Sequence, residues 1–146
     1  MSLESLRTFR AQVEEAVTME LAQITSKLVQ MERCCQALDA EIQTEAVAYR
    51  LQTEQGLAIE DILEWHGRME ARHAALQEAR LAVAALTEGW NHTQGRLVEA
   101  SQERKILDRL VDRRQQSRMR EHRHREQHAT DEAASRRHLP PGARLS

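Results

Sequence analysis

The side chains best suited to chemistry gather in the last quarter of the 146-residue chain, where histidines alternate with arginines and glutamates. His124 and His128 stand four residues apart and Glu121 precedes His124 by three, so all three would share one face of a helix. Imidazole and carboxylate groups at this spacing can hold a zinc ion. A solvated charged face is the better interpretation, because no further groups are available to orient the ligands. We therefore expect no metal and no cofactor.

The two cysteines, Cys34 and Cys35, are adjacent in the sequence. On a helix their side chains would point about 100° apart, so they could not comfortably form a disulfide with each other. Cys35 follows the apolar periodicity of its surroundings. We expect both to act as small apolar filler in a reducing compartment.

Charge is distributed unevenly along the chain. Residues 1–64 carry five basic and twelve acidic side chains, whereas residues 100–146 carry twelve basic and seven acidic ones. Clustered arginine favours non-specific nucleic-acid binding through counterion release. Interleaved acidic residues and the lack of any aromatic residue from Asn91 onward argue against a nucleic-acid groove. We expect no specific nucleic-acid partner, although a structural or nucleic-acid-associated coiled coil stays open as an alternative.

Nothing in the sequence predicts an enzyme. A phosphate-binding loop, a nucleophile with a nearby base and a Cys-x-x-Cys pair are all missing from the sequence, and a helical rod has no enclosed pocket in which to desolvate a catalytic group. The sequence also has no apolar run suited to a signal peptide or a membrane span. We expect a soluble, cytosolic protein.

The stretch from Ile62 to Val111 determines the predicted fold. Its apolar residues recur at alternating spacings of three and four over seven heptads, and only Arg72, Thr93 and Arg104 interrupt them. This pattern predicts one strand of a coiled coil. A helix of about fifty residues is roughly 75 Å long and needs a partner of matching length for its apolar seam. The apolar seam positions are Ile62, Trp65, Met69, Leu76, Ala79, Val83, Leu86, Trp90, Leu97, Ala100, Leu107 and Val111.

The same periodicity recurs in a first helix, whose seam extends from Leu3 to Tyr49 with one four-residue spacing in place of three between Val17 and Leu21. The apolar periodicity is then interrupted, and Gly56 is suited to end a helix. The sequence predicts one coiled-coil domain over residues 1–138, with helices at about 3–53 and 61–135 joined by a loose turn at about 54–60. Residues 139–146 are expected to be a disordered tail.

The two helices are predicted to form an antiparallel hairpin in which residue i faces about residue 113 − i. The second seam ends at Val111, where the first helix runs out, and the acidic first helix would lie beside the basic end of the second. A parallel dimer of one unbroken helix is the alternative. Gly89 and Gly95 flank Trp90, which indicates either close packing or local flexibility. From Asp112 onward the second helix has no apolar face and is predicted to protrude.

Several short elements stand near the end of the second helix. They are Glu103-Arg104-Lys105-Ile106-Leu107-Asp108-Arg109-Leu110, Arg113-Arg114-Gln115, Glu121, Glu126 and Asp131-Glu132. Together with the acidic, leucine-spaced first helix and the pair Tyr49-Arg50 before the turn, these elements resemble the flagellar export protein FliJ family. The resemblance covers about residues 3–138.

The resemblance implies an antiparallel coiled coil that serves the flagellar type III export apparatus as a non-enzymatic stalk. It implies association with the hexameric export ATPase, with the cytoplasmic domain of the membrane-embedded export gate and with export chaperones, at the inner membrane. Leu63, Trp65 and His66 are candidates for the gate contact, and Arg113, Arg114 and Arg118 for the contact with the ATPase ring. We expect the free chain to be a monomeric hairpin. The equivalent stalk of a virulence-type secretion system is the alternative within this class.

Overall fold

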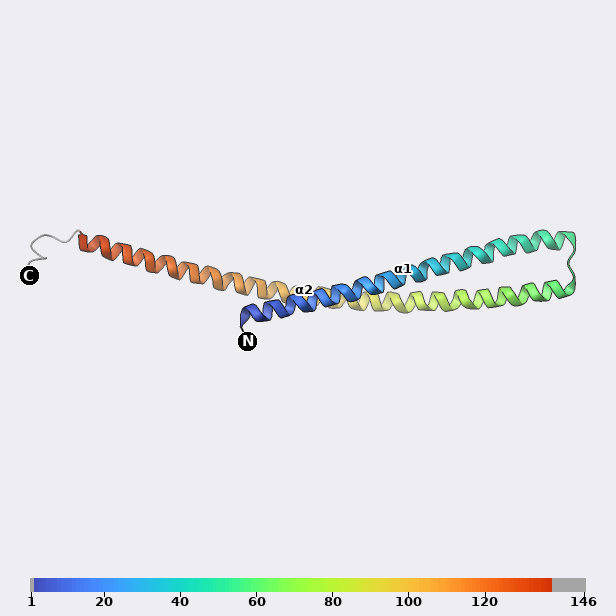
Figure 1. Ribbon diagram of the computed structural model, residues 1–146, viewed down its shortest axis with the longest axis horizontal. Coiled ribbons are helices and arrows are strands. Elements are labelled where there is room, and N and C mark those ends of the chain that lie inside the picture. Colours follow the sequence, from blue (N-terminus) through green and yellow to red (C-terminus); the bar gives the residue numbers. More distant parts are fainter. Residues whose placement is uncertain (1, 138–146) are drawn as a thin grey trace, which may run out of the picture. The chain divides into compact units, whose positions relative to one another are not determined.

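The computed structural model describes residues 2–137, which form two long α-helices and no strand. Helix α1 spans Leu3–Gln55 and helix α2 spans Ile59–Arg137 (Figure 1). The expected all-α helical hairpin with a protruding C-terminal helix is confirmed. The tail expected at residues 139–146 lies outside the described residues. No described helix has an apolar stretch long enough to cross a bilayer.

Local capping groups explain where α1 begins. The backbone N–H of Ser5 donates to the Ser2 hydroxyl at 3.1 Å, so Ser2 satisfies one of the amides that lack an intrahelical acceptor. Glu4 adds a negative charge in the first turn, where the positive end of the helix dipole favours it. The N-terminal boundary of α1 is therefore encoded locally.

The turn between the helices depends on Gly56, whose φ of 92° is a conformation that other residues rarely adopt. Its N–H donates to the Thr53 carbonyl at 3.2 Å. This hydrogen bond closes the end of α1, with Gly56 in the left-handed backbone conformation. Helix α2 starts three residues later, where the amides of Asp61 and Ile62 both donate to the Ala58 carbonyl. Ala58 has no side-chain acceptor, so the start of α2 lacks the capping seen at Ser2.

Contacts divide the chain into two compact units, and each is antiparallel in its own right. In the unit Val13–Ala100, paired residues have numbers that sum to between 113 and 117, close to the predicted 113. This agreement establishes the facing register across the unit. The pairs are Glu20 with Arg96, Thr25 with Trp90, Glu41 and Glu45 with Arg72, and Tyr49 with Trp65.

The seam positions form the core of this unit, as their spacing predicts. Ile42, Met69 and Leu76 make a buried cluster against which Cys35, Leu38 and Trp65 pack. Even the polar seam residue Thr93 is only 4% exposed. Both cysteines are free, with Cys34 exposed and Cys35 half-buried on the seam. A narrow apolar contact line, rather than a globular core, therefore holds the helices together.

The other unit joins residues 2–12 of α1 to residues 101–137 of α2. Arg7 pairs with Asp108 at 4.0 Å and Arg10 with Glu103 at 2.5 Å, so the antiparallel register also holds here. Val111, only 1% exposed, is the last buried residue of α2, and every residue from 112 to 137 is exposed. We call residues 112–137 the α2 extension; Figure 1 shows it continuing past the start of α1.

A polar interruption of the seam is satisfied by an ion pair between the helices. Arg72, at a seam position of α2, hydrogen-bonds to Glu45 and lies 3.8 Å from Glu41. The hydrogen bond to Glu45 raises the pKa of the Arg72 guanidinium, and burial opposes that rise. Both side chains of the Glu45–Arg72 pair are mostly covered, so the charges compensate each other where neither would be tolerated alone.

The antiparallel arrangement predicts a short distance between two residues that are far apart in sequence. Spin labels at Leu6 and Arg109 should lie within about 20 Å, because both flank the Arg7–Asp108 pair. Double electron–electron resonance measures this distance directly. A separation on the order of 100 Å, as in one unbroken helix, would refute the hairpin.

The seam should control stability more than surface charge does. Leu86→Asp places a carboxylate on the contact line and should lower the free energy of unfolding by on the order of 3 kcal/mol. Arg80→Ala alters an exposed side chain and should be nearly silent. Thermal melts of the two variants test this, and equal melting temperatures would show that the seam is wrongly assigned.

Gly89 and Gly95 are not explained by close packing, because a Cβ at either position would meet no heavy atom within 4 Å. Gly89→Ala and Gly95→Ala should therefore each stabilise the hairpin by about 1 kcal/mol, the difference in helix propensity. Gly56→Ala is the matched control and should destabilise it, because of the φ of 92°. Chemical denaturation measures all three, and a loss of stability at Gly89 or Gly95 would reveal a packing role.

Candidate interaction surfaces

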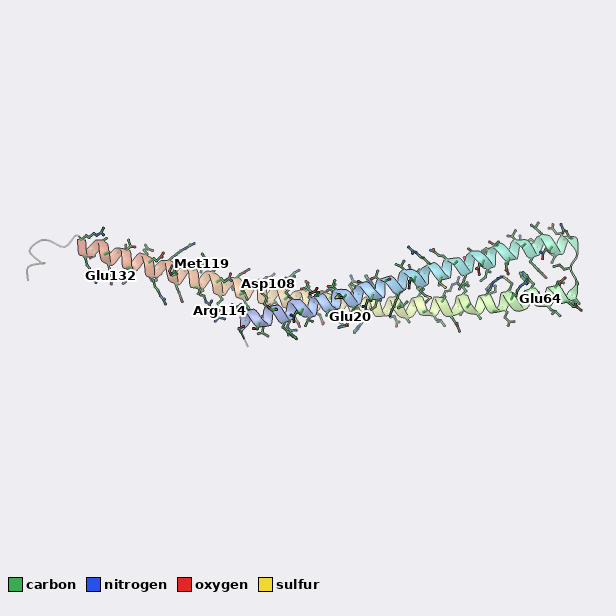
Figure 2. The ribbon with its side chains drawn as sticks, viewed as in Figure 1. Glu20, Glu64, Asp108, Arg114, Met119 and Glu132 are labelled. Carbon is green, nitrogen blue, oxygen red and sulfur yellow. The ribbon has the colours of Figure 1, made fainter. Side chains whose placement is uncertain are left out.

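The charged side chains of the α2 extension are exposed to solvent. Arg113, Arg114 and Arg118 are exposed and form no ion pair with another described residue. Figure 2 labels Arg114, Met119 and Glu132 along this segment, and α2 is drawn alone at Met119 and Glu132. Guanidinium groups in this setting keep their donors available for carboxylates or carbonyl oxygens of a partner. The guanidinium groups of Arg113, Arg114 and Arg118 are thus accessible from solvent.

The histidines of the extension make contacts along the helix rather than a metal site. His122 lies 3.1 Å from Glu126 and His128 lies 3.8 Å from Glu132, each one helical turn apart. Among residues 2–137, no group of three or more histidine, cysteine, aspartate or glutamate side chains is placed to hold a metal ion. An exposed face of the helix therefore carries Glu121, His124 and His128.

The second candidate surface lies beside the turn, where Leu63, Trp65 and His66 have different surroundings. Leu63 is 66% exposed, and nearby Ile59 is 73% exposed. Trp65 is half-buried, because its ring stacks on Tyr49 of α1 with centroids 3.8 Å apart and planes 13° from parallel. The exposed His66 ring stands edge-on to Trp65 at 5.2 Å. Leu63 and His66 are open to a partner, whereas Trp65 also holds the two helices together.

A cavity of about 300 Å³ adjoins this aromatic stack. It draws residues from both helices and from the turn, and it combines aromatic rings with two carboxylates and one guanidinium. The indole Nε1 of Trp65 is shielded from water and has no hydrogen-bond acceptor among the described residues. The lining residues are Tyr49, Gln52, Leu57, Asp61, Glu64, Trp65 and Arg68.

Tyr49 and the acidic wall of this cavity were not among the residues singled out from the sequence as candidates for partner binding. The facing register could have found Tyr49, because it places residue 49 opposite residue 64, next to Trp65. The cavity itself has no sequence signal, since its shape depends on how the chain leaves α1 at Gly56. The turn surface therefore includes α1 as well as α2.

Comparison with known proteins supplies the family. The family model described as "Flagellar FliJ protein" matches residues 1–142, which is nearly the whole chain. Neither the curated proteins nor the solved structures contain a significant match. The matched range includes both helices and the elements between Glu103 and Glu132 that resemble this family. The chain is a member of the flagellar FliJ protein family and has a role related to flagellar protein export.

Proposed function

We propose that this protein is a non-enzymatic stalk of the flagellar type III export apparatus that engages the hexameric export ATPase through its α2 extension. The observation that carries the proposal is the contrast at Val111. Up to this residue the seam of α2 is covered, and beyond it residues 112–137 are exposed throughout. An uncovered helix rich in arginine suits insertion into the bore of a ring, because contacts are possible on every side of it.

The two-helix coiled coil would transmit force or torque. Two helices joined by a continuous seam resist bending better than one, and their charged outer surface makes no tight contact that would arrest rotation. In this proposal the free chain is a monomeric hairpin, because α1 already covers the seam of α2. Engagement of the α2 extension would stimulate the ATPase activity of the ring.

The turn surface is proposed to contact the cytoplasmic domain of the export gate, with Leu63 and His66 as exposed contact residues and Trp65 as the residue that fixes the surface. Such a contact would hold the chain at the inner membrane although it has no spanning helix among the described residues. Export chaperones are proposed as further partners of the same coiled coil. A virulence-type system is less well supported, because the matching family is flagellar.

The ATPase contact is tested by reversing the charge of the extension. Arg113→Glu, Arg114→Glu and Arg118→Glu together should abolish both binding to the export ATPase and stimulation of its hydrolysis, since an acidic bore would repel the variant. The thermal melt of the hairpin should not change, because these side chains are exposed and form no ion pair with a described residue of α1. Binding is measured by surface plasmon resonance and stimulation by phosphate release.

A matched control places the same charge change elsewhere. Arg33, Arg50 and Arg80 are exposed in the unit Val13–Ala100, and their replacement by glutamate changes the net charge equally. This control should keep full stimulation. Stimulation that survives reversal in the extension, or that is lost equally in the control, would exclude the extension as the engaging element.

A further inference from the structure

An exposed apolar patch lies where α1 begins, just before the α2 extension. Phe9 of α1 is 51% exposed, and Ile106 and Leu110 of α2 are 55% and 42% exposed. All three belong to the unit that joins residues 2–12 to residues 101–137. Large apolar side chains that stay half in water after the hairpin has formed gain stability when a partner covers them.

Contacts around Arg10 show that these side chains share one side of the unit. The Arg10 guanidinium lies 5.9 Å from the centre of the Phe9 ring and pairs with Glu103 at 2.5 Å. Ile106 follows Glu103 by three residues and Leu110 follows Ile106 by four, so these side chains lie along one face of α2. Phe9 therefore lies beside this face, and the ion pair of Arg10 borders it.

The next turn of the same face is basic. Arg113 and Arg114 follow Leu110 by three and four residues, and both are exposed and form no ion pair with another described residue. Arg114 is labelled in Figure 2. Glu103, one turn before the patch, is already held by Arg10. An apolar turn followed by two unpaired arginines is complementary to a segment whose apolar side chains stand one turn away from carboxylates.

We propose that this face docks an amphipathic helix of a partner protein. The apolar residues of that helix cover Phe9, Ile106 and Leu110, and its carboxylates pair with Arg113 and Arg114. A helix presents side chains at spacings of three and four residues, which are the spacings on this face of α2. The arginines select an acidic partner, because a basic one would bring like charges together. The site deepens the proposed ATPase contact, and it rests on that proposed function for the identity of the protein that carries the helix.

A second copy of this chain fits the face less well. Its carboxylate at the patch, Glu103, is held by Arg10, so it offers no free acceptor to the arginines of the next turn. Light scattering on the full chain tests this alternative, and the expected result is a monomer. A dimer that Ile106→Gln with Leu110→Gln converts to monomer would overturn the proposal, because the face would then join two copies.

The docking face is tested on the full chain with a helical probe peptide. The peptide has two leucines one turn apart and two glutamates on the next turn, a covalent staple that keeps it helical and a fluorescent label. Its fluorescence anisotropy should rise in a saturable way as the chain is added. Peptides with lysine in place of glutamate, or with glutamine in place of leucine, should each bind about tenfold more weakly or worse. Equal binding of all three, or no binding of the first, would overturn the proposal.

Variants separate this patch from other exposed apolar side chains. Ile106→Gln with Leu110→Gln should weaken binding of the probe peptide by about tenfold or more. The matched control is Leu81→Gln with Val98→Gln, which replaces side chains of α2 that are 62% and 50% exposed in the other unit and should leave affinity within about twofold. An equal loss in the control would show that binding is non-specific and would overturn the proposal.

A measurement on the unaltered sequence guards against a patch variant that does not fold. Phe9 is the only phenylalanine of the chain, so fluorine-labelled phenylalanine places one reporter in the patch. Its fluorine NMR signal should shift in a saturable way when the acidic probe peptide is added. A signal that stays unchanged while the peptide binds would place the peptide elsewhere and overturn the proposal.

The ATPase is tested separately from the peptide. If the acidic peptide binds as described but the export ATPase does not bind the chain, the proposed ATPase contact is wrong and the docking face stands. If the ATPase binds and Ile106→Gln with Leu110→Gln leaves that affinity unchanged, the face is wrong as part of the ATPase contact. Loss of ATPase binding in this variant, with retention in Leu81→Gln with Val98→Gln, supports both.

Discussion

The apolar seam between α1 and α2 is the interaction on which every other feature depends. The chain has a single Phe and a single Tyr, and charged residues make up 30% of it, so it has little material for a globular core. Alternating three- and four-residue spacing concentrates what apolar surface there is along one line of each helix. Burying that line requires a partner helix, and the glycine turn at Gly56 supplies the partner from the same chain. Residues beyond Val111 are left exposed because α1 begins opposite this part of α2.

Polar residues on the seam refine this arrangement. The Glu45–Arg72 pair is satisfied only when α1 and α2 are antiparallel and in the observed register, because a shift of one turn would leave a charge against apolar neighbours. A few residues nearer the turn, the stack of Tyr49 on Trp65 fixes the same register through ring contact. Together they restrain the turn end of the hairpin, which is where the cavity forms. The geometry of the turn surface therefore follows from the register.

The fold could be predicted from the sequence because its determinants are local and periodic. The seam from Ile62 to Val111, the helix end at Gly56 and the loss of apolar phase after Val111 each have a direct sequence signal. The turn cavity could not be predicted, since its lining comes from two helices and a short connection whose path depends on one backbone angle. Periodicity places Leu63 off the seam, and its exposure of 66% agrees with that position. The identity of any partner carries no periodic signal, and here only the family match bears on it.

The central claim is that the exposed end of α2, and not the turn, enters the export ATPase. A photo-crosslinking residue at Met119, which is 56% exposed in the extension, compares directly with one at Ile59, which is 73% exposed beside the turn. After irradiation with the ATPase hexamer, denaturing electrophoresis separates free chain from adducts. The stalk account predicts an adduct with the ATPase from position 119 and none from position 59. An adduct from position 59 alone, or equal adducts from both positions, would contradict it.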